Sequence, residues 1–436
     1  MGTSESRNGN PALHRRRFLK VATALAVAPV LNVGLLARIN GRAGSGRQDD
    51  WVDAARREIP ASVNTSYFQT GGIGPAPTAV IEHVQERLAF QNRGPADPAI
   101  AESMASIEPN LRAHLGRSFG AKETEVALTH STSESISIAV WSRNWQRGDE
   151  IILSNQEHPA NVIPWYNLRD RFGVVLREID LHAGTDLIDQ VRRQLNSRTA
   201  MVSISHVSRN NGRAIPAELS AELGALLQAR GVRYHLDGAQ GPGCVATHFR
   251  TLGADYYSTC GHKWMLGPKG TGAFFVREEI LDQTLMSWSG AHSHSTMDYE
   301  GNYELLPSAA RFEFGTRALA TFAGFDRAVT WMEDIGMERI LGRINRLVAY
   351  AIERTQEYPR LAISSPVSPE ERSGVFVVKL PAGCDALDMY NTLRTDAGIL
   401  ASPVKWDRDF RLSIHFFNTT DEIDETLAAL NARCID

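Results

Sequence analysis

A lysine and an aspartate that follow two short apolar segments are the residues of this chain best suited to chemistry. The segments Val232–Leu236 and Ala254–Thr259 are rich in β-branched and aromatic residues, which predicts two strands. Asp237 follows the first, and His262 and Lys263 follow the second on a turn-rich connection. A buried amine near cationic groups loses its proton near neutral pH and attacks a carbonyl. A carboxylate pairs with the protonated nitrogen of a pyridine ring, which then accepts electrons from a carbanion.

Taken singly, Lys263 is explained as a surface lysine and Asp237 as a turn former before Gly238, because most such side chains are exposed. Their occurrence in one stretch favours a functional site. DGAQ at Asp237, with GHKW and GPKGTG around Lys263, resembles the signature of the class V aminotransferases. These are fold-type I pyridoxal 5'-phosphate (PLP) enzymes related to cysteine desulfurases and isopenicillin N epimerase. The resemblance implies that Lys263 binds PLP as an internal aldimine, that Asp237 faces the pyridine nitrogen and that Gln240 faces the phenolic oxygen.

A predicted strand, Glu125–Thr129, leads into a predicted helix that runs to Trp145. Small hydroxyl residues there would cap the helix, and free N–H groups at a helix start also bind phosphate, so both uses hold at once. The resemblance implies that Ser131, Thr132 and Ser133 form the phosphate-binding turn. Ser131 stands where the family commonly has a glycine. It also places Cys260 at the position of a serine that contacts phosphate. A thiol is a poorer hydrogen-bond partner, so we expect His262 to make more of that contact.

His158 follows another predicted strand, Glu150–Ser154, and open α/β sheets build their sites at strand carboxyl ends. The segment EHPAN, followed by PW, resembles the class V segment whose histidine stacks on the cofactor ring. A neutral imidazole there would also move protons. We therefore assign His158 and Lys263 as catalytic residues.

Three further positions concern the substrate. After the predicted strand Ala200–Ser205, HVS and a later glycine resemble a segment that often carries an asparagine near the cofactor, and either Arg209 or Asn210 takes that position. In the glycine-rich loop Ser66–Pro77, the resemblance places Thr70 and Gly71 beside the substrate.

Arg411 begins the segment RLSIHFFNT. A guanidinium holds a carboxylate in two parallel hydrogen bonds. Spacing alone allows an exposed arginine at a strand end equally well. Similarity to the carboxylate-binding RxSxxxYNT of the family favours a substrate role.

The segment around Thr316 resembles FExGT, which in the family reaches across a dimer interface to the partner's cofactor phosphate. The resemblance therefore implies a homodimer in which Gly315 and Thr316 serve the partner's site. The alternative is that Thr316 caps a helix over Ala318–Met332.

Near the N-terminus, RRRFLK precedes an apolar run, Val21–Ala37, in the order of a signal peptide, and it resembles a twin-arginine signal. A bilayer crossing needs about 20 apolar residues, and this run is shorter and interrupted by Pro29, so we expect no stable membrane anchor. We predict a signal peptide over 1–43, engagement of the twin-arginine translocase, and a periplasmic or secreted enzyme. A weak small-x-small pattern at Gly41–Ala43 leaves the cleavage site open.

Short apolar runs alternate with helical patterns along the chain, which predicts an α/β fold. We expect a fold-type I architecture, with a mostly parallel, seven-stranded type of sheet between helices and a smaller C-terminal α/β domain. The predicted parts are a linker over 44–65, a PLP-binding large domain over 66–320 and a small domain over 321–436. Two helices are expected between Pro77 and Phe119, separated near Pro95 and Pro98.

Composition excludes several classes of partner. The 436 residues are 43% hydrophobic and carry a net charge of −4 with both signs interspersed, so we expect a small-molecule substrate and no nucleic acid. The four cysteines lack metal-site spacing, and a single disulfide is left open for an exported protein. His292 and His294 lack acidic or cysteine partners in a strong pattern, so no metal is predicted.

Three functions are consistent with this resemblance. The first is Cα chemistry, such as transamination or epimerisation, on an amino acid or on an amino-acid moiety of a secreted metabolite, similar to periplasmic PLP enzymes of pyoverdine tailoring. The second is β-elimination by a C–S lyase. The third, a non-catalytic PLP-binding protein, is opposed by the presence of Lys263, Asp237 and His158. Cysteine desulfurase activity is disfavoured, because the loop Gly398–Trp406 lacks the nucleophilic cysteine of those enzymes.

Overall fold

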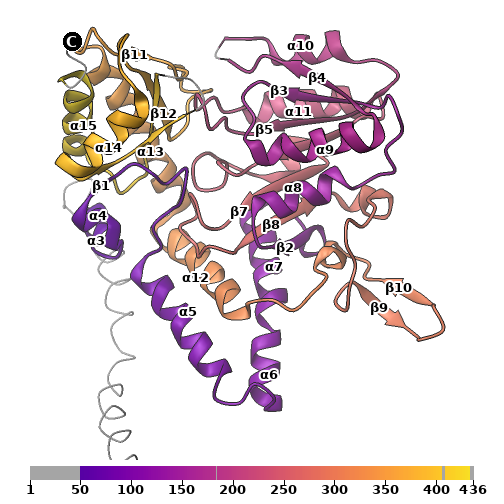
Figure 1. The fold of residues 1–436 in the computed structure, drawn as a ribbon. Helices are drawn as coiled ribbons and strands as arrows, with labels where there is room; N and C mark the ends of the chain where they lie inside the picture. Colours follow the sequence, from indigo (N-terminus) through magenta and orange to yellow (C-terminus); the bar gives the residue numbers. More distant parts are fainter. Residues whose placement is uncertain (1–49, 183, 405–407, 433–436) are drawn as a thin grey trace, which may run out of the picture. The chain divides into compact units, whose positions relative to one another are not determined.

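The computed structural model describes residues 50–182, 184–404 and 408–432, so the predicted signal peptide lies outside the described residues. The fold presented here is the compact unit that begins at Ala55. Figure 1 shows its two larger sheets and the helices around them. In the described part of the chain, no helix has both the length and the hydropathy needed to cross a membrane.

A seven-stranded sheet forms the larger layer, in the order β2-β8-β7-β6-β5-β3-β4. Neighbours from β4 to β7 pair in parallel, whereas β8 is antiparallel to both β7 and β2. The prediction of a mostly parallel, seven-stranded sheet is confirmed. Its strands are β2 (Val126–Thr129), β3 (Glu150–Ser154), β4 (Val175–Ile179), β5 (Thr199–Ser205), β6 (Arg233–Asp237), β7 (Tyr256–Cys260) and β8 (Gly272–Val276).

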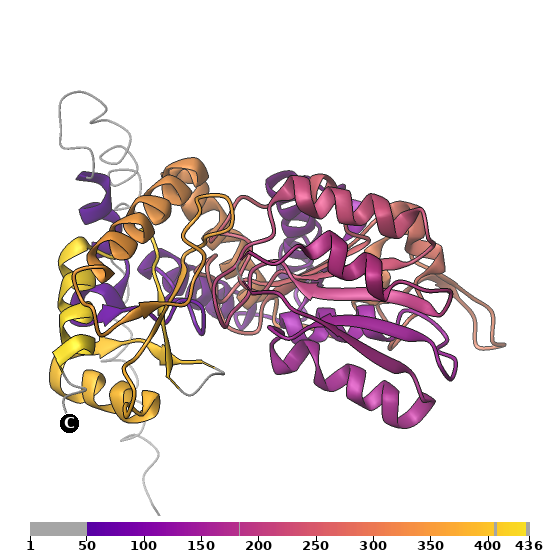
Figure 2. The same ribbon diagram turned by 90° about the horizontal axis from the view of Figure 1, so that it is seen from above.

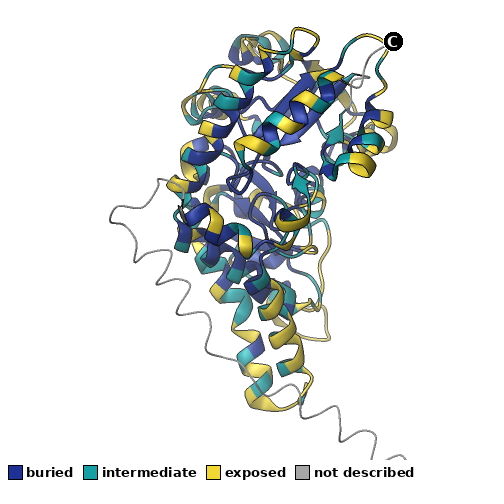
Figure 3. Cartoon of the chain, turned by 90° about the vertical axis from the view of Figure 1, so that its left-hand side faces the viewer, coloured by how far each residue is buried: buried dark blue, intermediate teal, exposed yellow. Residues whose placement is uncertain are grey.

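Burial explains why these strands are apolar along their whole length. Every residue of β2, β3, β5, β7 and β8 is buried, as expected where helices cover both faces of a sheet (Figure 2). Figure 3 shows the buried strands inside and exposed residues on the outer helix faces. Among these seven strands, only the edge strand β4 has exposed residues, which are Val175, Arg177 and Glu178. The helices of this part are α8 (Thr132–Val140), α9 (Ile163–Phe172), α10 (Leu187–Gln194), α11 (Ala217–Gln228) and α12 (Leu319–Ile335).

The C-terminal part contains a four-stranded antiparallel sheet in the order β11-β12-β15-β14. Its strands are β11 (Ala362–Ile363), β12 (Val375–Lys379), β14 (Ser402–Pro403) and β15 (Asp409–Ser413), and its helices are α13 (Met337–Thr355), α14 (Ala386–Ala397) and α15 (Thr420–Ala432). From the other end of the chain, β1 (Ser66–Tyr67) pairs in parallel with β13 (Ile399–Leu400). Just after β1, Gln69 forms a β-bridge to Ser413 at the end of β15. The two contacts bring the glycine-rich loop that follows β1 next to β15. The predicted domain boundaries stay predictions.

Two helix predictions were wrong. The segment expected to hold two helices holds three, α5 (Thr78–Gln91), α6 (Pro98–Ala105) and α7 (Ile107–Phe119). The second break falls at Ser106, because Pro109 has no N–H to donate and its ring excludes the preceding helical carbonyl. Helix α8 ends at Val140 and does not reach Trp145, whose indole Nε1–H donates to the Val140 carbonyl at 2.7 Å. That side chain satisfies a carbonyl at the helix end.

Elements outside these layers are short. Helices α3 (Asp50–Arg57) and α4 (Pro60–Asn64) precede β1. A hairpin of β9 (His294–Met297) and β10 (Tyr303–Leu305) was not predicted and carries exposed side chains. In the described part of the chain, no cluster of three or more His, Cys, Asp or Glu residues is arranged to hold a metal.

Candidate active site

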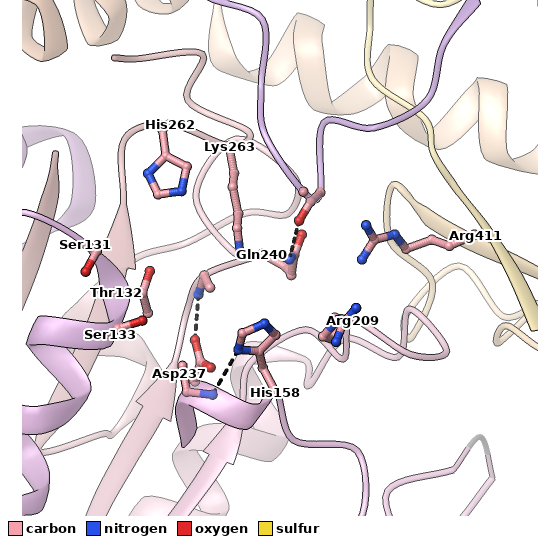
Figure 4. Close-up of a pocket in the computed structure, with 14 residues that line it drawn as sticks. Ser131, Thr132, Ser133, His158, Arg209, Asp237, Gln240, His262, Lys263 and Arg411 are labelled. Atoms are coloured by element: carbon pink, nitrogen blue, oxygen red, sulfur yellow. Dashed lines mark hydrogen bonds between the residues drawn. The ribbon is translucent and has the colours of Figure 1, made fainter. Parts of the chain in front are cut away.

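Most of the predicted site residues line one cavity of about 260 Å³ beside the carboxyl ends of β5 and β6 (Figure 4). Strand ends supply its floor and the Arg411 strand supplies its far wall. The predicted residues that line it are Gly71, Ser131, Thr132, Ser133, His158, Arg209, Asp237, Gln240, His262, Lys263 and Arg411. Segments that are hundreds of residues apart in the sequence thus meet at one cavity, as the motifs predicted.

The loop that carries Lys263 is fixed from both sides. Within it, the Leu266 N–H donates to the Lys263 carbonyl at 3.0 Å, and the Gly267 N–H donates to the Gly261 carbonyl at 2.8 Å. Leu266 adopts φ 55°, the left-handed region that non-glycine residues rarely occupy. From the glycine-rich loop, the Gly74 N–H donates to the His262 carbonyl at 2.7 Å. The backbone of the lysine is therefore held while its side chain enters the cavity (Figure 4).

Asp237 ends β6 and is almost fully buried. Its Oδ1 accepts from the Ala239 N–H at 2.9 Å, which leaves Oδ2 for another partner. Burial raises the pKa of the Asp237 carboxyl, while the Ala239 N–H and the Lys263 charge oppose that rise. A carboxylate held in this way is suited to pair with a cationic ring nitrogen.

His158 is neutral in this setting. Its Nδ1 accepts from the Ala160 N–H at 3.0 Å, so the ring proton is on Nε2. Burial, followed by the charges of Lys263, Arg209 and Arg411, lowers the pKa of His158 to about 4. A neutral aromatic ring at the cavity wall fits the predicted stacking position.

Gln240 and His262 complete the wall around the lysine. The Gln240 side chain donates through Nε2 to the Gly71 carbonyl at 2.8 Å and accepts at Oε1 from the indole of Trp264 at 2.6 Å. His262 Nδ1 is buried and has no hydrogen-bond partner among the described residues. Burial lowers the pKa of His262, with Lys263 adding to the effect.

The turn predicted for phosphate begins helix α8. Ser131 is the N-cap, and its Oγ accepts from the Glu134 N–H at 3.3 Å. The following N–H groups start the helix beside the cavity, where the helix dipole favours an anion. The hydroxyl residues and the start of α8 thus lie together at the cavity, so the same turn can cap the helix and bind a phosphate.

Two guanidiniums form the opposite side. Arg411 is 3% exposed, and its Nε has no hydrogen-bond partner in the described part of the chain. Burial and the neighbouring charge of Arg209 lower the pKa of Arg411 to about 9. Arg209 lines this cavity, whereas Asn210 turns its Nδ2 to the Gln156 carbonyl at 3.0 Å.

Besides Asn210, four predicted residues do not line the cavity: Cys260, Thr70, Gly315 and Thr316. Cys260 is buried with its Sγ 3.9 Å from the Ala239 carbonyl, and burial raises the pKa of its thiol. Thr70 is also buried, whereas Thr316 is exposed. Ala318, not Thr316, is the N-cap of α12, so the capping alternative for Thr316 was wrong.

Sequence reasoning missed Glu157, which precedes His158. Its carboxyl is buried and accepts from the Ser205 N–H at 2.9 Å, the Ser205 hydroxyl at 2.8 Å and the Asn161 Nδ2 at 2.8 Å. Ser205 pairs in register with Asp237 across β5 and β6. Glu157 therefore supports the strand end next to Asp237. Its place three residues after the buried strand β3 was the available signal.

Comparison with known proteins identifies the family. Residues 66–425 match the model of the family "Aminotransferase class-V". The chain is 27% identical over 402 residues to the isopenicillin N epimerase of Streptomyces clavuligerus, covering 88% of this chain and 98% of that one. It is 28% identical over 402 residues to a probable cysteine desulfurase of Mycolicibacterium paratuberculosis, covering 87% of this chain and 58% of that protein's length.

Solved structures support the fold. The chain superposes on C-DES with a TM-score of 0.81 at 24% identity, covering 86% of this chain and 99% of the other. One C-DES structure is a mutant with glycine covalently linked to the PLP cofactor, and another is described as the cystine C–S lyase in complex with cysteine persulfide. The fold-type I prediction is thereby confirmed.

The residues of the cavity fit PLP. A lysine side chain enters it, a buried carboxylate with one unused oxygen stands at β6, and a buried imidazole nitrogen of His262 lacks a partner among the described residues. The start of α8 offers N–H groups to a phosphate. Lys263, Asp237, His158 and the α8 turn would hold the cofactor. The chain belongs to the class V aminotransferases and is a PLP-dependent enzyme.

Proposed function

We propose that this enzyme carries out Cα chemistry, by transamination, epimerisation or a related step, on an amino acid or on an amino-acid moiety of a secreted metabolite. The observation that carries the proposal is the convergence of Lys263, Asp237 and Arg411 on one cavity. An amine, an acid and a carboxylate receptor are the groups that such chemistry needs.

PLP supplies an electron sink for the bond that breaks at Cα. Arg411 binds the substrate carboxylate in two parallel hydrogen bonds, which orients the bonds at Cα. Asp237 Oδ2 would hold a proton on the ring nitrogen of bound PLP, and the Lys263 amine would take the Cα proton and return it. His158, neutral and held by the Ala160 N–H, would pack against the ring and add no positive charge there.

A second candidate is β-elimination, in which the same residues act and a group leaves from Cβ. Similarity to C-DES, described as a cystine C–S lyase, supports this candidate. Cysteine desulfurase activity is less favoured despite the related desulfurases, because the 398–406 loop has no cysteine. Product analysis separates the candidates: a keto acid or an inverted amino acid supports Cα chemistry, and pyruvate with a released thiol supports elimination.

The first experiment is visible absorption spectroscopy of the purified protein with a panel of amino acids. We expect a cofactor band in the wild type that shifts with one class of amine and is lost in Lys263→Ala. Lys269→Ala is the matched control, because Lys269 is an exposed lysine on the same connection. A wild type that stays colourless after PLP is added would contradict the proposal.

We further propose that the protein is exported by the twin-arginine translocase and acts as a homodimer. The RRRFLK segment supports export, and the exposure of Thr316 supports its use by a partner subunit. Replacing Arg15, Arg16 and Arg17 with lysine should retain the protein in the cytoplasm, as cell fractionation would show. In a dimer of one wild-type and one Thr316→Ala subunit, PLP retention should weaken only in the site of the wild-type subunit, because Thr316 is proposed to serve the partner's site.

A further inference from the structure

Arg411, which is buried, and Arg209, which is half-buried beside it, differ from the other buried arginines of the described chain. Arg213 pairs with Glu371 at 2.6 Å, Arg311 pairs with Asp282 at 3.1 Å, and Arg343 donates to the Phe416 carbonyl at 2.6 Å. Neither Arg209 nor Arg411 has an ion pair with any described residue. A buried cation without a counterion is costly, so Arg411, with the half-buried Arg209 beside it, is suited to an anion that the protein does not itself supply.

The charges that line the cavity are unbalanced. Lys263, Arg209 and Arg411 are cationic residues, and Asp237 is the one carboxylate among the described lining residues. The charge of Arg209 adds to burial in lowering the pKa of Arg411, as expected for two cations on one side of a cavity. Anions bound at this side would relieve that repulsion.

The cofactor phosphate does not serve this pair. Figure 4 shows the turn from Ser131 to Ser133 on one side of the cavity and the two arginines on the other, with Lys263 and His158 between them. A phosphate at the turn is therefore separated from both guanidiniums by the reacting centre. The anions that Arg209 and Arg411 bind belong to the substrate.

Arg209 also borders a second hollow of about 530 Å³, whose wall includes Val162, Ile163 and Tyr166. It thus lies between the reacting centre and a space that a side chain or an attached group enters. Arg411 is not among the residues that line that second hollow. The two guanidiniums therefore have different positions along a bound substrate.

We infer that Arg209 binds a second acidic group of the substrate, so that the enzyme selects an amino acid, or an amino-acid moiety, that carries a carboxylate on its side chain. This inference rests on the proposed function, in which Arg411 binds the α-carboxylate. Arg209 is then a specificity-determining residue, and Cα chemistry on a neutral amino acid proceeds with weaker binding.

The test compares charged and neutral substrates of nearly equal shape. Dissociation constants for L-glutamate and L-glutamine, and for L-aspartate and L-asparagine, are measured from the absorbance change of the PLP-loaded protein. We expect the wild type to prefer the acidic member by about 10- to 100-fold, the effect of one charge-assisted hydrogen bond. Arg209→Gln should abolish that preference while leaving the neutral amino acid bound nearly as before.

Three variants keep the result interpretable. Arg209→Lys retains the charge and should retain part of the preference, and Arg230→Gln replaces an exposed arginine and should match the wild type. Arg411→Gln should weaken acidic and neutral amino acids alike. Equal loss for both members of a pair in Arg209→Gln, or loss of the preference in Arg209→Lys as well, would overturn the inference. A wild type that binds amino acids without an acidic preference would overturn it while leaving the proposed function intact, whereas a wild type that responds to no amine would overturn both.

Discussion

The Glu157→Gln substitution should change how stability depends on pH. Burial raises the pKa of Glu157 from 4.5 to about 7, against the hydrogen bonds from Ser154, Asn161 and Ser205. The folded state therefore binds this proton more tightly than the unfolded state. The stabilisation is complete below the unfolded pKa and is lost as pH rises through the folded value.

The magnitude follows from that shift. One pKa unit corresponds to about 1.4 kcal/mol, so between about pH 5 and about pH 8 this group removes about 2–3 kcal/mol of folding stability. Glutamine does not titrate and removes none. Other groups titrate in the same range, so the difference between wild type and variant is the quantity that isolates Glu157.

Glutamine also has a fixed cost. Glu157 Oε1 accepts from the Ser205 N–H, and Oε2 accepts from Asn161 Nδ2. The Asn161 amide cannot rotate, because its Oδ1 accepts from Ser203 Oγ at 2.8 Å and from the Trp165 indole at 3.3 Å. The glutamine NH₂ must therefore face one of two donors, which costs about 1–3 kcal/mol.

The assay is urea unfolding with saturating PLP, followed by tryptophan fluorescence at both pH values. Glu157→Gln should be the less stable protein at about pH 5, and the difference should shrink by about 2–3 kcal/mol at about pH 8. Glu338→Gln, which changes an exposed carboxylate, serves as the control. A difference that does not vary with pH would refute the reasoning.

Three other predictions concern the site loop and the core. Gly74→Ala would place the new Cβ on the Lys263 carbonyl oxygen, so PLP occupancy and the unfolding midpoint should both fall. Gly342→Ala is the control: its new Cβ would lie 3.7 Å from the nearest atom, so this variant should be neutral or stabilise the protein by up to about 1 kcal/mol. Trp264→Phe removes the donor to Gln240 Oε1 and should cost about 1–3 kcal/mol in urea unfolding, with a change in the cofactor spectrum; an unchanged protein would contradict the buried bond. Burial lowers the pKa of His206 to about 4, of His235 to about 3 and of His415 to about 4. The stability that these neutral histidines contribute should therefore be lost as pH falls from about 6.5 toward those values, and acid unfolding should take up protons. An unfolding free energy that does not vary with pH in this range would contradict the prediction.

Local sequence patterns predicted most of the elements. Parallel strands covered on both faces are continuous apolar runs, and for that reason β3 has the predicted bounds. Pro109 was overlooked, and with it the break between α6 and α7.

The residues of the candidate site also differ in how far the sequence predicted them. Asp237, His158 and Lys263 were proposed from sequence because each lies at or just after a predicted strand end, and in open α/β sheets such positions converge at the carboxyl edge. The structure places all three at one cavity. Cys260 was assigned by its position in a motif; it ends β7, buried beside the Ala239 carbonyl, and its contact with phosphate stays a prediction.

The sequence by itself therefore determined the class of fold, the lysine and its acid partner, because each depends on short-range spacing. Tertiary structure alone decided that Arg209 and not Asn210 lines the cavity, that Arg411 lacks a counterion among the described residues, and that Glu157 is buried beside the end of β5. Burial and charge pairing are sums over neighbours far apart in the chain. No local pattern contains them, since the neighbours come together only when β1, β5 and β15 are in place.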